Sequence, residues 1–537
     1  SSITSGVLNS PISVIIQEIT SVSSLIVTGG TCSVAASDNS CAAKFTCSSF
    51  DNQASGSLEF YSVEMTLSAA SLNLADISTV DSMKFTLGGS ADFGNLATTT
   101  GSTGTVTIIQ SNTNSTLDIA SIDSFGAVSI TTNGTTFTLD GDVLTENGDV
   151  SISASLATVT LYNITSAEDI TLYGFDINQK TNSIFSALQG RFDAACGGIF
   201  YAESGAAINS PIISIITQST IVVEGVYSGV TDLTLSAGSD GNISLGGNLD
   251  LQNLTTLALG GNVITVEGIS GDSIDMVVNS SQFIQNGNLS VNSLGVSVSN
   301  HIVIDGTIDA NLDCSLVSSS NDDSSIRVLV NKDISASSIT ISSVYSQVLG
   351  DLIGCTNTSS IDTCGIVSIT SSSTQPFLLD CVDIIGYEIS IDVGGAIEPY
   401  TAVTTCSNSI ISKMGDITVD AVDDISLLQN IVTSADRITM TATGQCVFGN
   451  DCVYTAASDI DIQCESLTIG GSSSSITSSQ GLILLDLTSG AMSAPYTSVS
   501  AFTTMTVKTL NQPIEGYRFE SGGNMILNAG SQVFTSA

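Results

Sequence analysis

His301 is the only histidine in this sequence, so any acid-base chemistry that needs an imidazole depends on it. A serine or cysteine nucleophile needs a positioned base and a third group that orients the base. His301 lies in Ser299-Asn-His-Ile-Val-Ile-Asp-Gly306, at the start of an alternation of apolar and polar residues. No nucleophile-elbow sequence accompanies it. We interpret His301 as a solvent-facing or corner residue, and we assign no catalytic and no cofactor-binding residue.

Acidic residues are the next candidates for chemistry. Adjacent pairs occur at Asp322-Asp323, in a polar loop, and at Asp423-Asp424, directly before the triplet Ile425-Ser-Leu427. Asp140-Gly-Asp142 followed by Glu146-Asn-Gly-Asp149 resembles an acidic turn but lacks the ligand spacing of an EF-hand. We expect structural turns here and assign no metal ligands. Weak Ca²⁺ binding at these acidic turns is the alternative.

The sequence contains 12 cysteines, an even number. Several are near neighbours, such as Cys355/Cys364, Cys446/Cys452 and Cys41/Cys47. Zinc sites usually show C-x2-C spacing or histidine partners, and both are missing here. We therefore expect disulfides formed in an oxidising compartment, with the connectivity left open. The disulfide candidates are Cys32, Cys41, Cys47, Cys355, Cys364, Cys381, Cys406, Cys446, Cys452 and Cys464.

Asparagine offers a possible modification chemistry. N-x-[ST] sequons occur at Asn114, Asn133, Asn163, Asn242, Asn253, Asn279, Asn288 and Asn357. The abundance of Ser and Thr gives about this many by chance, so the sequons permit N-glycosylation without indicating it. The chain opens Ser1-Ser-Ile-Thr rather than with Met, which is compatible with a removed signal peptide. We expect a secreted or cell-surface protein.

The charge balance excludes several partners. The sequence has 51 acidic and 10 basic residues, for a net charge of −41. Such a chain repels phosphate, so we expect no nucleic acid and no anionic membrane surface as a partner. Mean hydropathy is positive, but no run of about 18 apolar residues occurs, so we expect no membrane span. Acidity is interpreted as a source of solubility, with cation binding between coils or subunits as the alternative.

The elements that must position these residues are short strands that recur. Ile417-Thr-Val419 is followed by Ile425-Ser-Leu427, and Ile438-Thr-Met440 is followed by Cys446-Val-Phe448. Apolar-polar-apolar triplets are typical of strands with one buried face. Their return about every 21 residues predicts a solenoid whose coils bury apolar faces against each other. The expected fold is all-β: a single elongated parallel β-helix of about 20 to 24 coils.

Departures from this repeat divide the chain. Residues 1–56 are the least regular and are expected to form an N-terminal cap or docking segment with a cysteine-rich loop. Residues 57–537 are expected to form one continuous solenoid. An inserted loop is predicted near 179–211, where the spacing in Ser183–Phe192 suits a short helix. A looped cysteine-rich stretch is predicted near 355–406.

The triplets and their Gly, Asn and Asp corners resemble right-handed parallel β-helix proteins. Among these the chain is most similar to filamentous-haemagglutinin-type adhesins and other surface β-solenoids. The resemblance covers about residues 57–537 and is one of pattern, without a diagnostic motif. Polygalacturonase-like members of the fold place several Asp residues, a His and an R-I-K segment together. Here R-I-K is absent and the basic residues are scattered.

The strand pattern continues through Asn524–Ala537 without a polar or helical cap after it. An exposed terminal coil favours head-to-tail contact with another copy, and such a contact generates a filament. The leading expectation is a secreted structural subunit of an extracellular filament or surface layer, stiffened by disulfides, with itself as partner. A cell-surface adhesin with a glycan or other surface ligand is the alternative. A polysaccharide lyase or hydrolase is the third.

Overall fold

A computed structural model describes the chain except residues 1–4, 17–23, 35–39, 53–57, 75, 100–103, 252–253, 272, 356–363, 380, 401–407, 430 and 536–537. The chain is all-β, a single parallel β-solenoid of about 22 turns that is 65% strand and, among the residues described, has no helix. The predicted fold class and coil number are therefore confirmed.

Contacts between residues divide the chain into two compact units, Ser1–Asn262 and Val263–Ala537, and each is described by itself. The strands up to the boundary are β1 (Ser5–Ile16), β2 (Ser24–Val34), β3 (Ala42–Asn52), β4 (Leu58–Phe60), β5 (Ser62–Leu67), β6 (Ser71–Leu74), β7 (Ile77–Thr79), β8 (Met83–Leu87), β9 (Ser90–Thr98), β10 (Val106–Gln110), β11 (Thr116–Ser124), β12 (Val128–Thr132), β13 (Thr136–Leu139), β14 (Val143–Thr145), β15 (Val150–Leu161), β16 (Ile164–Ser166), β17 (Ile170–Gln179), β18 (Ile184–Ala187), β19 (Arg191–Cys196), β20 (Phe200–Ala202), β21 (Ala207–Asn209), β22 (Ile212–Thr217), β23 (Ile221–Val223), β24 (Val226–Ser228), β25 (Asp232–Ser236), β26 (Asn242–Asp250) and β27 (Thr256–Ser270), which contains the boundary.

The strands of the second unit follow the same pattern. They are β28 (Asp275–Gln285), β29 (Leu289–Val291), β30 (Ser293–Ile304), β31 (Ile308–Ala310), β32 (Asp313–Ser318), β33 (Val328–Val330), β34 (Ile334–Ser335), β35 (Ser338–Ser343), β36 (Ser346–Val348), β37 (Leu352–Ile353), β38 (Ile366–Ser371), β39 (Phe377–Leu379), β40 (Ile384–Gly386), β41 (Glu388–Val393), β42 (Ile397–Glu398), β43 (Ser409–Ser412), β44 (Ile417–Ala421), β45 (Ile425–Leu427), β46 (Ile431–Ser434), β47 (Ile438–Ala442), β48 (Gln445–Phe448), β49 (Val453–Ala456), β50 (Ile460–Cys464), β51 (Ser466–Ile469), β52 (Ser474–Ser478), β53 (Ile483–Leu487), β54 (Met492–Ala501), β55 (Met505–Thr509), β56 (Ile514–Ser521), β57 (Met525–Asn528) and β58 (Val533–Thr535).

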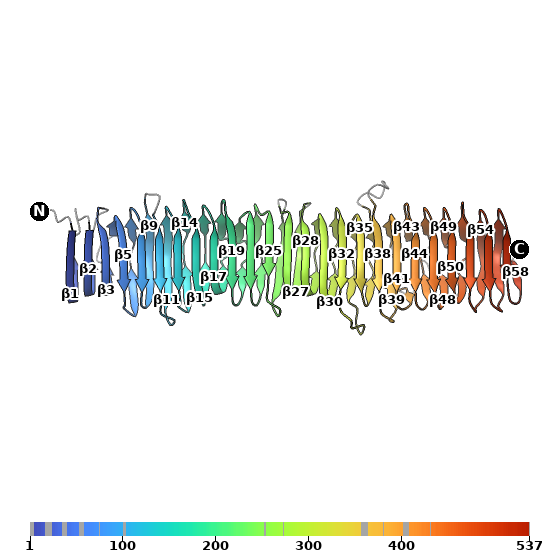
Figure 1. Cartoon of the computed structure of the whole chain (residues 1–537), viewed down its shortest axis with the longest axis horizontal. Helices are drawn as coiled ribbons and strands as arrows, with labels where there is room; N and C mark the ends of the chain where they lie inside the picture. The colour runs from blue at the N-terminus through green and yellow to red at the C-terminus, as the bar shows by residue number, and fades with distance from the viewer. Residues whose placement is uncertain are drawn as a thin grey trace. The chain divides into compact units, whose positions relative to one another are not determined.

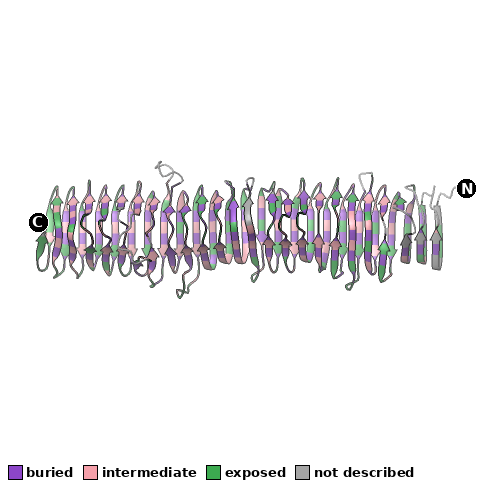
Figure 2. Cartoon of the chain, turned by 180° about the vertical axis from the view of Figure 1, so that it is seen from behind, coloured by how far each residue is buried: buried purple, intermediate pink, exposed green. Residues whose placement is uncertain are grey.

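Strand formation follows from the alternation of side chains. Strand β47 buries Ile438, Met440 and Ala442, while Thr441 between them is exposed. Successive side chains of a strand point to opposite faces, and β-branched residues suit the pleated surface. The same alternation of buried and exposed positions marks strands throughout each unit (Figure 2). One face of most strands therefore enters the core and the other remains outside, whereas β57 has no buried residue.

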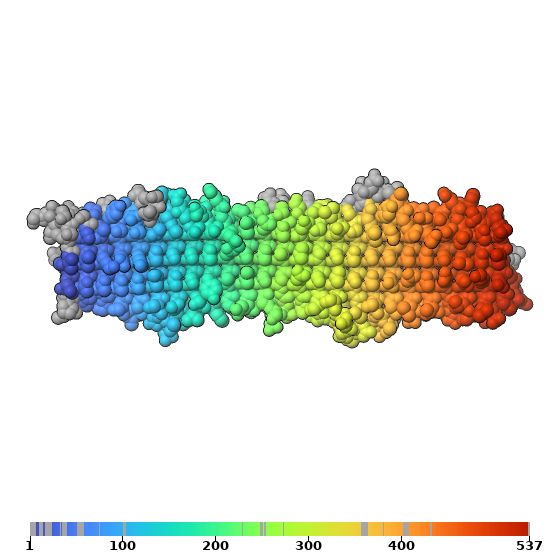
Figure 3. Space-filling view, in the orientation of Figure 1, coloured from blue at the N-terminus to red at the C-terminus, as the bar shows by residue number. Residues whose placement is uncertain are grey.

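Pairing between coils is parallel and in register. Ile417 pairs with Ile438, and Ile438 pairs with Ile460, so one repeat of the sequence is one coil. Strands of successive coils lie side by side within each unit (Figure 1). Outward side chains consequently form rows across the coils (Figure 3). The predicted relation between repeat and coil is correct.

The core consists of columns of apolar side chains stacked from coil to coil. Valine, isoleucine and leucine dominate it, with aromatic rings where there is room. Phe45 contacts Phe60 with ring centroids 6.1 Å apart, and Phe185 stacks on Phe192 at 5.7 Å. Each fully buried side chain of this size contributes about 1.5 to 3 kcal/mol. Stability is therefore distributed along the columns.

Glycine is required where corners of neighbouring coils touch. A Cβ on Gly287 would collide with the backbone oxygen of Glu267 in the preceding coil. Gly471 has φ +86°, a left-handed conformation that other residues rarely adopt. Substitution at either corner would displace backbone that the next coil uses for pairing.

The helix predicted within Ser183–Phe192 is wrong. Residues Ile184–Ala187 form β18 and Arg191–Cys196 form β19. Phe185 pairs with Ile164 and Ile208 of the neighbouring coils, so it enters a core column, whereas Leu188 is 63% exposed at the bend. A helix would leave the backbone groups of both neighbouring coils without partners. Pairing between coils overrides the local spacing of apolar residues.

The described parts of the N-terminal and cysteine-rich stretches contain strands that pair with neighbouring coils. Strands β1, β2 and β3 pair with one another in parallel, and β3 pairs with β5, so the described part of residues 1–56 continues the sheet. In the stretch 355–406, strands β38 to β42 pair with neighbouring coils. Residues 356–363 and 401–407 of that stretch lie outside the described residues.

Truncation of one column side chain tests this account of stability. Ile438→Ala is expected to lower the free energy of unfolding of its unit by about 2 to 5 kcal/mol, because a cavity opens between two packed coils. Thr441→Ala, on the outward face of the same strand, should change it by no more than about 0.5 kcal/mol. Urea unfolding measures both, and equal effects would contradict the assignment of the faces.

Candidate functional site

Acidic corners form the most regular polar feature of the structure. Asp149 Oδ1 accepts the backbone N–H of Asp169 at 3.0 Å, one coil later. Asp424 Oδ1 accepts the N–H of Gln445 in the same way at 2.6 Å. The other acceptor and donor pairs of this kind are Asp76 and Asn95, Asn163 and Ile184, Asp169 and Arg191, Asp176 and Ile199, Asn288 and Thr307, Asp333 and Asp351, Asp351 and Asp383, Asp383 and Ser409, Asp416 and Arg437, and Asp459 and Leu482.

These corners give many acidic residues a structural role. Each acceptor directly precedes a buried apolar residue, as Asp149 precedes Val150 and Asp424 precedes Ile425. A carboxylate that accepts a backbone N–H forms a charge-assisted hydrogen bond, which is stronger than a neutral one. This ladder of corner hydrogen bonds was not predicted from the sequence, although an Asp or Asn before the first apolar residue of a triplet is a visible signal for it.

One column of corners brings three carboxylates into line. Asp351 N–H donates to Asp333 at 3.0 Å, and Asp383 N–H donates to Asp351 at 2.8 Å. The column ends at Ser409, whose N–H and hydroxyl both donate to Asp383. Burial, and then the charges of Asp333 and Asp383, raise the pKa of Asp351. Repulsion between stacked carboxylates therefore opposes the hydrogen bonds of this column.

Asp451 shows the opposite electrostatic balance. Its carboxylate accepts the backbone N–H groups of Ser472 at 2.7 Å and Ser473 at 2.9 Å. These hydrogen bonds lower the pKa of Asp451. Asp451 itself has φ 55°, a left-handed conformation that Asp and Asn tolerate. The ionised carboxylate thus stabilises this corner.

His301 lies beside Arg327, a residue that the sequence analysis did not single out. The guanidinium Nη1 of Arg327 is 3.4 Å from Nδ1 and 3.3 Å from Nε2 of His301. Burial, and then the charge of Arg327, lower the pKa of His301. Asp322, which the sequence placed in a separate loop, joins the cluster through an ion pair with Arg327. The fold therefore brings together His301 and Asp322, which were interpreted separately from the sequence.

Arg327 acts as a clamp on the loop that precedes it. Its side chain is 4% exposed, and its Nε donates to the backbone oxygen of Asp322 at 2.6 Å. Its remaining nitrogens bind the Asp322 carboxylate and the Asn300 side-chain oxygen of β30. Asp323 accepts from Ser373 at 3.4 Å, which ties the loop to a further coil. The donors of Arg327 are committed to protein acceptors, so the cluster fastens loop 319–326 to the coils.

The predicted acidic turn near residues 140–149 also takes part in contacts between coils. Asp142 accepts from the side-chain nitrogen of Asn163 at 2.8 Å, and Asp149 belongs to the ladder of corners. Among the residues that the structure describes, no group of three or more His, Cys, Asp or Glu side chains is arranged to hold a metal ion. Weak Ca²⁺ binding at these turns therefore remains a proposal.

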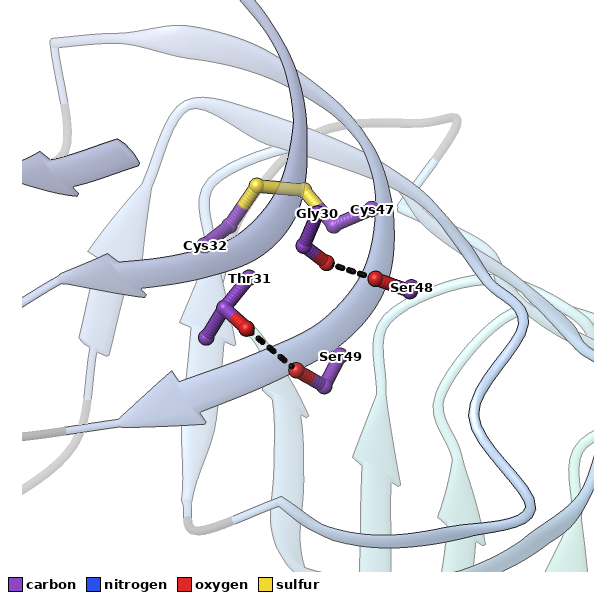
Figure 4. Close-up of a disulfide and its surroundings, with 6 residues drawn as sticks. All are labelled: Gly30, Thr31, Cys32, Cys47, Ser48 and Ser49. Atoms are coloured by element: carbon purple, nitrogen blue, oxygen red, sulfur yellow. Dashed lines mark hydrogen bonds between the residues drawn. A yellow bond between two sulfur atoms is a disulfide. The ribbon is translucent and has the colours of Figure 1, made fainter. Parts of the chain in front are cut away.

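Cysteine pairing is visible at two places. Cys32 in β2 is bonded to Cys47 in β3, one coil later, beside a hydrogen bond of 3.2 Å from Ser49 to Thr31 (Figure 4). Cys355 is bonded to Cys364, two of the predicted near neighbours. Cys47 thus bonds to Cys32 and not to Cys41, which is buried. Cys381 is also disulfide-bonded, and Cys406 lies outside the described residues.

The remaining cysteine candidates are Cys446, Cys452 and Cys464. All three are buried thiols in the second unit, and Cys196 and Cys314 are buried thiols as well. The near-neighbour pair Cys446 and Cys452 is not bonded.

The sequons differ in their surroundings. Asn114, Asn133, Asn242, Asn279 and Asn288 are exposed. Asn163 is half-buried, and its side chain binds both Asp142 and the N–H of Ile184. Asn253 and Asn357 lie outside the described residues. Exposure at five sequons leaves N-glycosylation sterically open there.

Comparison with protein families, curated proteins and solved structures finds no match for this chain. The fold class therefore rests on the strand pairing alone. Across the residues described, the structure holds no helix with the length and apolarity needed to cross a membrane.

Removal of charge from the carboxylate column provides a test with a defined pH dependence. Because folding raises the pKa of Asp351, its ionisation opposes folding. This penalty develops as pH rises from the unfolded value of about 3.9 through the folded pKa, and is complete above it. Asp351→Asn should therefore raise the unfolding midpoint at pH 7 and leave it unchanged at pH 3.

Asp451→Asn is the matched variant with the opposite sign. The lowered pKa of Asp451 means that its carboxylate stabilises the fold above about pH 3.9, and this contribution is lost as pH falls through the folded pKa. The variant should lower the unfolding midpoint at pH 7, with a smaller difference in acid. Shifts of the same sign for both variants would contradict the electrostatic assignment of the two corners.

Loss of the clamp should release the loop. Arg327→Ala is expected to lower the free energy of unfolding by about 1 to 3 kcal/mol, because Asn300 and the loop backbone lose their donor. It should also make residues 319–326 sensitive to a protease of broad specificity. Arg191→Ala removes a half-exposed pair with Asp193 and should cost about 0 to 1 kcal/mol. An unchanged cleavage rate in Arg327→Ala would exclude a clamp.

Proposed function

We propose that this protein is a secreted structural subunit of an extracellular filament or surface layer, in which copies stack end to end as coils stack within the chain. The observation that supports this proposal is the repeated interface between coils. Backbone pairing, core columns and corner ladders recur from one coil to the next, as in Ile417, Ile438 and Ile460. A contact between copies could use the same three interactions without a new recognition surface.

The direction of this interface favours an open assembly. In a parallel stack, one side of a corner offers a carboxylate and the other offers a backbone N–H, as Asp416 offers its carboxylate to the N–H of Arg437. The two sides are complementary but different, so contact between copies is heterologous. Heterologous contacts that do not close by rotation generate filaments. The proposed partner is therefore a second copy of this chain.

The extracellular location is proposed from cysteine and surface chemistry. Disulfides such as Cys32–Cys47 persist in oxidising compartments and are rare in the cytosol. Only 10 Lys and Arg residues in 537 leave few cleavage sites for trypsin-like proteases. Exposed sequons such as Asn114 are compatible with a glycoprotein. The filamentous-haemagglutinin-like type is the finer form of the same proposal.

A cell-surface adhesin is the second candidate, and the outward rows of side chains favour it. Tyr173, Ala195 and Ile216 occupy one outward row, with Tyr173 48% and Ile216 52% exposed. Exposed aromatic and aliphatic side chains in a row offer contact area to a glycan or a protein ligand. An adhesin would use this row while remaining unpolymerised.

Electron microscopy and sedimentation of the purified chain over a range of concentrations test the proposal. We expect filaments whose fibre diffraction shows a spacing of about 4.8 Å along the axis, because coils stack along it. Soluble monomers at high concentration that bind a glycan array would favour the adhesin instead. Release of reducing ends from acidic polysaccharides would contradict both and favour an enzyme.

Two lysine variants separate end-to-end from lateral assembly. Met525 pairs with the buried Met505 and is 41% exposed on its own coil, whereas Ile216 is 52% exposed on an outward row. Met525→Lys should abolish filaments, since it places a charge in a core column. Ile216→Lys should leave them intact. The reverse result would show that copies associate through their sides.

A further inference from the structure

Two buried thiols of the second unit face each other across successive coils. Cys446 lies in β48, and Cys464 ends β50 in the following coil. Both are fully buried. Thr441 pairs with Gln463, so the next residues along, Ala442 and Cys464, also lie side by side. Ala442 ends β47, and the corner that follows it leads to Cys446. One thiol therefore ends a strand of the later coil, and the other is the second residue of the next strand of the earlier coil.

The established disulfide Cys32–Cys47 has the same relation to its corner. Cys47 pairs with Gly29, and Cys32 follows Gly29 by three positions. Cys464 lies beside Ala442, and Cys446 follows Ala442 by four positions. In both cases the later coil supplies the thiol before the corner, and the earlier coil supplies the thiol after it. The first pair shows that a corner of this kind accommodates a disulfide.

The contacts of Cys464 support the comparison. Its Sγ donates to the backbone oxygen of Ser466 at 3.2 Å, and Ser466 pairs with Gln445, the residue directly before Cys446. The hydrogen bond with Cys464, and then burial, raise the pKa of the Cys446 thiol. Cys452 is held at the following corner, where its N–H donates to the Ser474 hydroxyl at 3.2 Å. Cys464 is thus the partner that the contacts give to Cys446.

We propose that Cys446 and Cys464 are a site of oxidation that joins two successive coils by a disulfide. With glutathione disulfide as oxidant, one cysteine thiolate attacks a glutathione sulfur and releases one glutathione thiolate. The second cysteine thiolate then attacks the protein sulfur of the mixed disulfide and releases the other. The two cysteine protons pass to the released thiolates, giving one protein disulfide and two reduced glutathiones. The thiolate is the nucleophile in both steps.

Because both thiols are buried in the folded chain, we expect the disulfide to form during folding. In the folded coils both thiols are inaccessible, and the raised pKa of Cys446 disfavours its thiolate. A soluble disulfide therefore reacts while the corner is still open, before the following coils cover it. The chain folded with oxidant should hold the cross-link, whereas the reduced folded chain should acquire it slowly.

Digestion with a protease that cleaves before aspartate gives a direct test. It places the three neighbouring cysteines on separate peptides: 436–450 with Cys446, 451–458 with Cys452 and 461–485 with Cys464. The full chain is refolded with reduced and oxidised glutathione, its free thiols are alkylated in denaturant so that buried thiols react, and it is digested without reduction. We expect peptide 436–450 linked to peptide 461–485, and peptide 451–458 alkylated.

Two outcomes would overturn the proposal. Peptides 436–450 and 461–485 could both carry the alkyl group, or either could be linked to 451–458. As a matched pair of variants, Cys452→Ser should retain the cross-link, and Cys446→Ser should leave Cys464 alkylated. Under oxidising conditions Cys446→Ser should unfold at a lower temperature than Cys452→Ser. If Cys446→Ser does not fold, the map of the unsubstituted chain alone decides.

Discussion

In-register pairing of each coil with the next is the constraint on which the rest of the structure depends. Parallel strands of a sheet lie about 4.8 Å apart, so a side chain in one coil packs directly on its counterpart in the next. Ile417, Ile438 and Ile460 are such counterparts, and each is fully buried. A thin core can be filled only if every coil places a similar volume at the same point. This explains why valine, isoleucine and leucine recur at the triplet positions, and why Gly287 must approach the backbone of Glu267 closely.

The corners meet the same constraint with polar groups. Where the chain turns, a carboxylate of one coil accepts the N–H of the next, so the acidic composition is coupled to backbone pairing. Register then decides the electrostatics of each column. Asp333, Asp351 and Asp383 place like charges in one column. Arg437, in contrast, donates its backbone N–H to Asp416 and a guanidinium N–H to Asp459. The acidic residues therefore help to join successive coils.

The less regular features also fasten coils together. Arg327 holds a loop against β30, and Cys32–Cys47 joins β2 to β3. The proposed Cys446–Cys464 bridge would join coils at a corner of the same kind. Each is a cross-coil tie added to pairing that already exists. A molecule whose polar and covalent contacts serve stacking in this way suits the structural role proposed above, in which stacking continues between copies.

The sequence by itself determined the fold class, the repeat and the coil number, because alternation along a strand and the return of triplets are local properties. The tertiary structure decided which residues meet. Ser183–Phe192 has spacing that suits a helix, yet Phe185 enters a column between Ile164 and Ile208. His301, Asp322 and Arg327 come together, and Cys47 bonds to Cys32 although Cys41 is nearer in sequence. The physical reason is register: partners lie about one coil apart, and loops of varied length shift each coil, so only the folded chain aligns one corner with the next.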